Sequence, residues 1–190
     1  MTALQKQFGL IDIYLFDQLL RGNIAPGMTI FDAGCGYGRN LRYFINEGYQ
    51  VFGIDADADA VASFHSDQFR HEAIEHNSFP DAFADVVISS AVLHFARDDD
   101  HFDAMLHGSW RVLKPGGLFF CRLASSIGIE HLIRPIAGRR HHLPDTSTRY
   151  LVDEDLLMRK TAELNATLLD ALKTTVVQNQ RSMTTWVLRK

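Results

Sequence analysis

Short continuous apolar runs alternate along the chain with segments in which apolar residues recur every three or four positions. The runs predict buried strands, and the three-and-four spacing predicts amphipathic helices. The predicted strands lie at 28–31, 50–54, 69–75, 85–90, 118–124, 167–177 and 183–188. This alternation predicts an α/β protein with a doubly wound, mainly parallel sheet and helices on both faces.

The first apolar stripe of helical spacing consists of Phe8, Ile11, Leu15, Phe16, Leu19 and Leu20. It predicts a single amphipathic helix within residues 1–22. Further helices are predicted from Leu41 to Gly48 and over 57–64, 98–113 and 153–164. The last two predicted strands are joined by a short polar segment and are expected to form an antiparallel pair.

A glycine-rich loop, Asp32-x-Gly34-x-Gly36-x-Gly38, separates the first strand from its helix. Such a loop lets backbone N–H groups approach a ligand closely. Asp55 ends the second strand, 21 residues after Gly34, and with the glycines fits either a dinucleotide or another adenosine cofactor. Asp32 distinguishes these two classes of cofactor. In a dinucleotide site, its negative charge would lie beside the negatively charged pyrophosphate, which is unfavourable. A cationic amine, as in S-adenosylmethionine, is the better match.

These residues resemble the motifs of class I S-adenosylmethionine-dependent methyltransferases. The glycine loop resembles their first motif, Asp55 their second-strand acid, and Arg111-Val112-Leu113-Lys114-Pro115-Gly116-Gly117 their turn into strand five. The resemblance covers about residues 28–124. The Gly38-Arg39-Asn40 extension is also similar to the tellurite-resistance and thiopurine methyltransferase branch.

The resemblance implies a Rossmann-like sheet of seven strands in the order 3-2-1-4-5-7-6, with strand 7 antiparallel. It implies one domain over residues 1–190, with the helix in 1–22 lying over the cofactor pocket. The segment 125–150 would be a substrate-covering insertion. This segment is rich in arginine and histidine and either attracts an anionic substrate or is a solvated loop. His141 and His142 have no third ligand at metal-site spacing, so no metal site is expected.

The resemblance also implies how the cofactor is held. Asp32 would contact the methionyl ammonium, and Asp55 would accept the ribose hydroxyls. Glu75 would accept a hydrogen bond from the adenine amino group, while the His76 N–H would reach the adenine ring. The implied cofactor-binding residues are Asp32, Ala33, Gly34, Gly36, Asn40, Asp55, Ala56, Glu75, His76 and Ser90.

Two residues are candidates for catalysis. Methyl transfer is an in-line displacement in which the protein mainly orients the reactants, and a base is needed only for an acceptor that carries a proton. His94, at the exit of the fourth strand, suits proton transfer near neutral pH. Tyr14 could face the pocket from the first helix. Both residues also have an alternative structural interpretation: His94 as a capping or packing side chain, and Tyr14 as a side chain that packs at the edge of the apolar stripe.

Composition narrows the class of protein. The chain has 190 residues and a formal net charge of −4, which disfavours broad attraction to nucleic acid or anionic membranes. No apolar run is long enough for a membrane span, and the N-terminus lacks signal-peptide features. Cys35 and Cys121 fall at interior positions and are expected to be core residues. A cytoplasmic enzyme, monomeric or homodimeric, is the simplest expectation.

The expected reaction is methyl transfer to a small-molecule acceptor, with S-adenosylhomocysteine as the second product. Ser89-Ser90-Ala91-Val92 stands where amine-directed relatives that act on nucleic acid or protein carry Asn/Asp-Pro-Pro-Tyr/Phe. Two alternatives stay open. One is an NAD-dependent oxidoreductase, against which Asp32 and the absence of a Tyr-x-x-x-Lys motif argue. The other is a catalytically silent cofactor-binding or regulatory module of the same fold.

Overall fold

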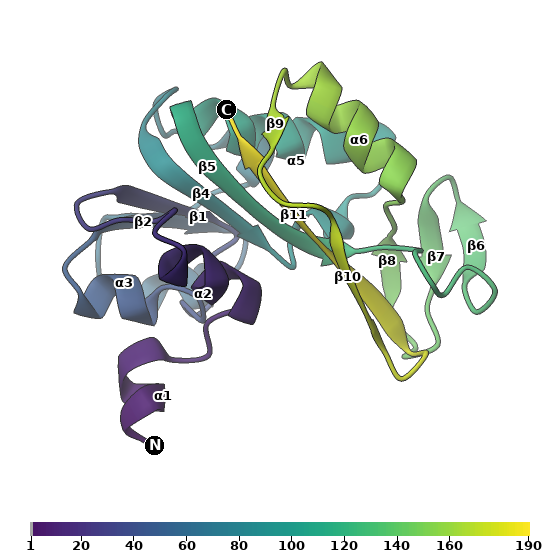
Figure 1. The fold of residues 1–190 in the computed structure, drawn as a ribbon, viewed down its shortest axis with the longest axis horizontal. Helices are drawn as coiled ribbons and strands as arrows, with labels where there is room; N and C mark the ends of the chain where they lie inside the picture. The colour runs from purple at the N-terminus through teal and green to yellow at the C-terminus, as the bar shows by residue number, and fades with distance from the viewer. Residues whose placement is uncertain (1) are drawn as a thin grey trace.

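The computed structural model describes residues 2–190 and centres on a twisted sheet of eight strands with helices on both faces (Figure 1). The strands of this sheet are β1 (Thr29–Ala33), β2 (Gln50–Asp55), β3 (Phe69–His71), β4 (Ala84–Ser90), β5 (Leu113–Ala124), β9 (Thr167–Leu168), β10 (Lys173–Val177) and β11 (Arg181–Arg189). The helices are α1 (Ala3–Phe8), α2 (Ile13–Leu20), α3 (Arg42–Asn46), α4 (Ala58–Ala62), α5 (Asp99–Val112) and α6 (Glu154–Glu163), with short 3-10 helices η1 (Ile74–His76) and η2 (Leu93–Phe95).

The order of the strands confirms the predicted topology. They lie in the order β3-β2-β1-β4-β5-β11-β10. The first five strands in this order are parallel to one another, and β11 is antiparallel to β5. The predicted sixth strand, 167–177, is interrupted, and both of its parts, β9 and β10, pair with β11. The interruption lets the Asp170 carboxylate accept hydrogen bonds from Gln18 of α2 and from Arg21, which caps the end of that helix. The sheet therefore has eight strands in place of the expected seven.

The two faces of the sheet bury separate apolar clusters. One cluster packs α5 and α6 against the sheet and includes Phe102, Trp110, Phe119 and Trp186. The other packs α2 and α3 against the opposite face and includes Leu15, Ile30, Phe44 and Phe120. Burying a side chain of this size contributes about 1.5–3 kcal/mol, so both faces hold the strand ends rigidly in place.

The prediction of one helix within residues 1–22 is wrong. The segment forms α1 and α2, with a break at residues 9–12. Gly9 adopts φ 65°, and Asp12 caps α2 by accepting the Tyr14 N–H at 2.9 Å. A capping carboxylate starts a new helix even where apolar spacing continues across it. α1 instead packs on α3, with the Phe8 and Tyr43 rings stacked.

The third strand is shorter than predicted and ends at His71. Beyond it, the Glu72 carboxylate accepts hydrogen bonds from the N–H and the hydroxyl of Ser78, which turns the chain back on itself.

The predicted helices at 57–64 and 98–113 are present as α4 and α5, capped by Asp57 and Asp98. No helix of the described residues 2–190 has the length and apolar content needed to span a bilayer.

The segment 125–150 contains a second, three-stranded sheet at the edge of the molecule (Figure 1). Its strands are β6 (Arg134–Ala137), β7 (Arg140–His142) and β8 (Thr148–Tyr150). An ion pair between Arg139 and Asp153, at 2.7 Å, ties it to the start of α6. This small sheet follows β5 directly, so it lies next to the strand ends that carry the site.

Candidate functional site

Two adjoining cavities lie at the carboxyl ends of the central strands. The first, which we call the glycine-loop cavity, has a volume of about 450 Å³ and is lined by Gly34, Gly36, Asp55 and residues 72–75, among others. The second, the arginine cavity, has a volume of about 330 Å³ and is lined by four arginines. Ala91 and Phe95 line both, so the two cavities share a wall.

The glycine loop is folded tightly against β2 and β4. The N–H groups of Gly34 and Cys35 both donate to the Ile54 carbonyl at 2.9 Å. Gly34 has φ 101°, and a Cβ there would lie 2.4 Å from a methyl group of Val92. Asp55 accepts the Gly36 N–H at 2.7 Å and the Asp57 N–H at 2.9 Å. Asp55 therefore fixes the loop as well as lining the cavity.

Asp32 lies at the end of β1 and is only 2 % exposed. Its Oδ1 atom is buried and has no hydrogen-bond partner within residues 2–190. Burial, followed by the charge of Asp55, raises the pKa of Asp32 well above its ordinary value, and Arg39 opposes this rise. A buried carboxylate without a partner is costly, and an incoming cation would offset that cost.

The predicted adenine contacts lie in the short helix η1. Glu75 lines the glycine-loop cavity, and its carboxylate is 3.1 Å from His101 Nε2. Burial raises the pKa of Glu75, but its own backbone N–H and His101 lower it more. The His76 N–H donates to the Ala73 carbonyl, and the His76 side chain is exposed. The structure therefore does not support the predicted ring contact from this N–H.

Glu72 and Ala73 also line this cavity, and sequence reasoning missed them. The signal was an acid directly after a strand, as with Asp32 and Asp55. It was hidden because the third strand was predicted to continue to residue 75. His101 and Met105 of α5, which line the same cavity, carried no local signal at all.

The remaining predicted cofactor residues are spread over different positions. Ala56 lines the glycine-loop cavity, and Ser90 lines the arginine cavity, where its hydroxyl accepts from Arg39 Nη2 at 3.1 Å. Ala33 is fully buried within β1. Asn40 lines neither cavity, because its Oδ1 accepts the Asp12 N–H at 3.0 Å. Asn40 thus ties the start of α2 to the glycine loop.

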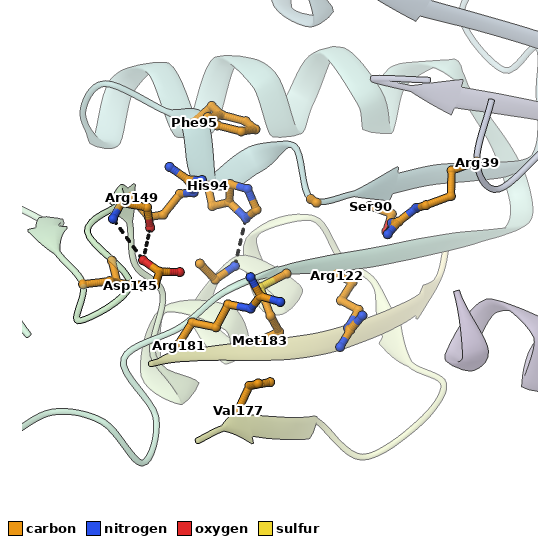
Figure 2. A pocket seen from close by; sticks show the side chains of 14 residues that line it. Arg39, Ser90, His94, Phe95, Arg122, Asp145, Arg149, Val177, Arg181 and Met183 are labelled. Atoms are coloured by element: carbon orange, nitrogen blue, oxygen red, sulfur yellow. Dashed lines mark hydrogen bonds between the residues drawn. The ribbon is translucent and has the colours of Figure 1, made fainter. Parts of the chain in front are cut away.

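His94 lies on η2 and lines the arginine cavity, buried to 5 % exposure. Its Nδ1 accepts the Ala124 N–H at 3.2 Å (Figure 2), which assigns the ring proton to Nε2. Burial, followed by the charge of Arg149, lowers the pKa of His94 to about 3. A neutral ring with a protonated Nε2 is a hydrogen-bond donor toward the cavity, in contrast to the general base expected from the sequence.

Tyr14 lines neither cavity. Its hydroxyl is 2.9 Å from Thr175 Oγ1 on β10, and its ring lies beneath the guanidinium of Arg122. Residues of the N-terminal segment also border a groove of about 470 Å³, where Gly9 and Leu10 face Tyr37 and Gly38. The segment thus flanks the glycine loop, and none of its residues lines the glycine-loop cavity.

The four arginines of the second cavity come from four separate parts of the chain. Figure 2 shows Arg39 and Arg122 with Ser90 toward one end, Arg149 and Arg181 toward the other, and His94 between them. Sequence reasoning singled out Arg39, in the Gly38-Arg39-Asn40 extension, and Arg149, in the basic segment. Arg122 and Arg181 belong to β5 and β11, and the four side chains meet only in the folded chain.

One carboxylate, Asp145, shares this lining. Its Oδ1 accepts both the N–H and the hydroxyl of Ser147. Burial raises the pKa of Asp145, but Ser147, Arg149 and Arg181 together lower it more. A second carboxylate, Asp12, pairs with Arg122 at 2.8 Å from outside the cavity. The lining is therefore strongly cationic overall.

Comparison with known proteins agrees with this geometry. Residues 31–121 match the methyltransferase domain family. The predicted family is confirmed, whereas the finer likeness to the tellurite-resistance and thiopurine branch stays a prediction. The matched segment holds the end of β1, the glycine loop, β2 to β4 and most of β5.

Two curated relatives each match more than half of this chain. A malonyl-[acyl-carrier protein] O-methyltransferase of Serratia marcescens is 29% identical over 159 residues, which cover 78% of this chain and 58% of that protein. An uncharacterized methyltransferase of Synechocystis is 33% identical over 110 residues, covering 55% and 51%. The chain thus spans little more than half the length of these relatives.

Solved structures share the fold of the methyltransferase domain. A S-adenosylmethionine-dependent methyltransferase of Methanosarcina mazei superposes with a TM-score of 0.75 at 18% identity, covering 90% of this chain and 96% of that one. A 1,6-didemethyltoxoflavin-N1-methyltransferase of Burkholderia thailandensis superposes with a TM-score of 0.69 at 19% identity, covering 90% and 75%. The predicted Rossmann-like methyltransferase fold is confirmed.

Proposed function

We propose that the chain is an S-adenosylmethionine-dependent methyltransferase that transfers a methyl group in line to a small-molecule acceptor and releases S-adenosylhomocysteine. The observation that carries this proposal is Asp32, a buried carboxylate with an unpartnered oxygen at the glycine loop. The methionyl ammonium of the cofactor is a small cation with N–H donors, and it would supply the partner that this carboxylate lacks. Bound in this way, the cofactor supplies an activated methyl group on a sulfonium.

The residues of the glycine-loop cavity fit the rest of the cofactor. Gly34 and Gly36 leave the backbone open at the loop, and Asp55 supplies carboxylate oxygens suited to ribose hydroxyls. Glu72 and Glu75 supply acceptors for the adenine amino group at the other side of the cavity. The predicted role of Asp32 is kept, and Asn40 acts here as a positioning residue for the loop.

The arginine cavity is the proposed acceptor site. It shares Ala91 and Phe95 with the glycine-loop cavity, so an acceptor there would lie beside the transferable methyl group. Its volume of about 330 Å³ is that of a small-molecule pocket. Residues 143–149 supply part of its lining, which supports the segment 125–150 as a substrate cover within a single methyltransferase domain. Two structural relatives are named for small-molecule substrates, 1,6-didemethyltoxoflavin and magnesium protoporphyrin IX.

We also propose that the enzyme works in the cytoplasm, as a monomer or homodimer, without nucleic-acid or membrane partners. The formal net charge of −4 disfavours attraction to polyanions. The two cysteines are buried and unpaired, which suits a reducing compartment. Four arginines line the arginine cavity, where a small anion would fit.

Calorimetry of the purified chain tests the cofactor. S-adenosylhomocysteine is expected to bind saturably, with no binding of NAD. Asp32→Asn keeps the shape of the side chain but removes its charge, and should weaken S-adenosylhomocysteine binding by about tenfold or more. Asp67→Asn, at an exposed position, is the matched control and should bind like the parent chain.

The outcomes separate the alternatives. Binding of NAD alone would favour the oxidoreductase and contradict the proposal. Binding of neither compound would contradict it as well. Cofactor binding without methyl transfer to any acceptor would favour the catalytically silent module. Normal binding by Asp32→Asn would show that the ammonium lies elsewhere.

A further inference from the structure

The protein neutralises only part of the cationic lining of the arginine cavity, since Asp12 pairs with Arg122 and Asp145 is the one carboxylate in a lining with four arginines. Within residues 2–190, neither Arg149 nor Arg181 has a carboxylate oxygen within 4 Å. Arg149 lies over the Phe95 ring, with its guanidinium carbon 4.9 Å from the ring centroid, and donates to the Thr148 carbonyl. Guanidinium groups with free donors are suited to planar anions such as carboxylates.

The two ends of the cavity have different neighbours. Arg39 is close enough to Asp32 to influence its pKa, so this end adjoins the proposed ammonium site. Arg122 belongs to the same end and is already paired with Asp12. Arg149 and Arg181 lie at the opposite end, near Asp145 (Figure 2). These two arginines are therefore the ones free to hold an acceptor.

Among residues 2–190, the arginine cavity offers two candidate proton acceptors, His94 and Asp145, and the structure disfavours both in that role. His94 Nδ1 is occupied by the Ala124 N–H, and its Nε2 already carries the ring proton. Asp145 Oδ1 is held by Ser147, and two arginines favour its ionised form. A stabilised carboxylate is a weak base, so an alcohol, phenol or amine acceptor would be poorly served by these two side chains.

We propose that the acceptor is a small-molecule carboxylic acid, bound as its carboxylate by Arg149 and Arg181, and that the reaction forms its methyl ester. The inference rests on the proposed function and specifies its substrate class. A carboxylic acid is ionised at neutral pH and needs no base, whereas a thiol is mostly protonated. The His94 Nε2–H is placed to donate to the bound acceptor.

The step balances without a proton transfer. A carboxylate oxygen forms the new C–O bond with the methyl carbon as the methyl C–S bond breaks. The electron pair of that bond goes to sulfur, so the sulfonium becomes the neutral thioether of S-adenosylhomocysteine. The carboxylate loses its charge on becoming an ester, so the arginines hold the product less strongly than the substrate.

Binding to the protein loaded with S-adenosylhomocysteine tests the recognition step. The probes are acetate, benzoate and succinate, together with their primary amides as neutral analogues, each titrated by calorimetry. At least one acid should bind and its amide should not. Arg149→Gln combined with Arg181→Gln should weaken that binding by about tenfold or more, with unchanged affinity for S-adenosylhomocysteine. Arg159→Gln, exposed on α6, is the matched control.

Methyl transfer from methyl-labelled S-adenosylmethionine tests the chemistry. Mild alkali releases methanol from a methyl ester but leaves methyl ethers, thioethers and methylamines intact. The label should therefore reach the acid that binds and be lost in alkali. The kcat/KM for that acid should be flat from about pH 6 to pH 9, because no base titrates in this range. His94→Gln, which keeps a side-chain N–H donor, should retain more turnover than His94→Leu.

Several results would overturn the inference. They are alkali-stable label, a rate that rises with pH through a single ionisation, and equal binding of acids and amides. Failure of every acid to bind the loaded protein would also overturn it. In each of these cases S-adenosylhomocysteine still binds, so the proposed function survives. If S-adenosylhomocysteine itself does not bind, the proposed function fails first.

Discussion

The glycine-loop cavity and the arginine cavity share a wall but are built in different ways. The first is organised around the glycine loop, which the Asp55 carboxylate holds to β2, and is completed by residues from η1 and α5. The second is formed by long charged side chains from four distant segments. The first suits a ligand that is common to a whole family, and the second suits one that is particular to this chain.

Charge separates the two cavities as well. The first is lined by the carboxylates of Asp55, Glu72 and Glu75, with the buried Asp32 of β1 close to Asp55, and the second is lined mainly by guanidinium groups. A cofactor with a cationic amine and an anionic acceptor would each be drawn to the matching side. The contrast predicts that variants in one cavity alter one ligand and leave the other unchanged.

Gly34→Ala is expected to have the largest effect on the glycine-loop cavity. Alanine would keep a backbone at φ 101° that side chains disfavour, and its Cβ would lie 2.4 Å from Val92. The loop must move to relieve this contact, so we expect a loss of S-adenosylhomocysteine affinity of roughly 100-fold, measured by calorimetry. Circular dichroism checks that the variant is folded.

The matched control for this variant is Gly22→Ala. Gly22 also has a positive φ, at 73°, but a Cβ at this position would have open space around it, with no atom within 4 Å. It should lose stability from backbone strain alone and bind S-adenosylhomocysteine normally. Equal binding by Gly34→Ala and the parent chain would show that the ligand does not require this close approach.

Asp32→Asn is expected to have the next largest effect, here on stability without ligand. The raised pKa means that the folded chain holds the Asp32 proton more tightly than the unfolded chain does. Its destabilising effect is therefore absent below the ordinary carboxyl pKa and grows as pH rises toward the raised value. The ligand-free variant should be more stable than the parent at pH 8, by about 1–3 kcal/mol.

Urea denaturation at several pH values measures this effect. The advantage of the variant should shrink toward about pH 4, where the parent carboxyl is protonated in both states. Saturating S-adenosylhomocysteine should stabilise the parent more than the variant and so reduce or reverse the difference. If the variant is less stable than the parent at every pH, Asp32 has a stabilising partner in the ligand-free protein, which would contradict this prediction.

The parts of the fold that could be predicted from the sequence are those encoded by contiguous residues. The order of the strands, the glycine loop and the place of Asp32 all follow from one strand–loop–helix unit and its family resemblance. The break between α1 and α2 was missed because the apolar spacing continues through it, while Gly9 and Asp12 decide the local backbone. Long-range contacts, such as Asp170 with α2, interrupt the sixth strand in a way no local pattern shows.

The site shows the same division. Asp32, Asp55 and Glu75 carry their signal in position relative to predicted strands, and all three lie around the glycine-loop cavity or the end of β1. Arg122 and Arg181 carry none, because an arginine within a strand is ordinary until its neighbours in space are known. His94 was found from its position, but its proton-donating tautomer depends on the Ala124 N–H, which is 30 residues away in sequence.

Tyr14→Phe is expected to have the smallest effect and sharpens the boundary of the site. It removes the hydroxyl that pairs with Thr175 but keeps the ring beneath Arg122. The variant should lose about 0.5–1.5 kcal/mol of stability in urea denaturation, and Thr175→Val should lose a similar amount. Because the two groups share one hydrogen bond, the double variant should cost less than the sum of the single ones. Since Tyr14 lines neither cavity, affinity for S-adenosylhomocysteine should be unchanged. Weakened binding would instead place the tyrosine at the cofactor, as the sequence allowed.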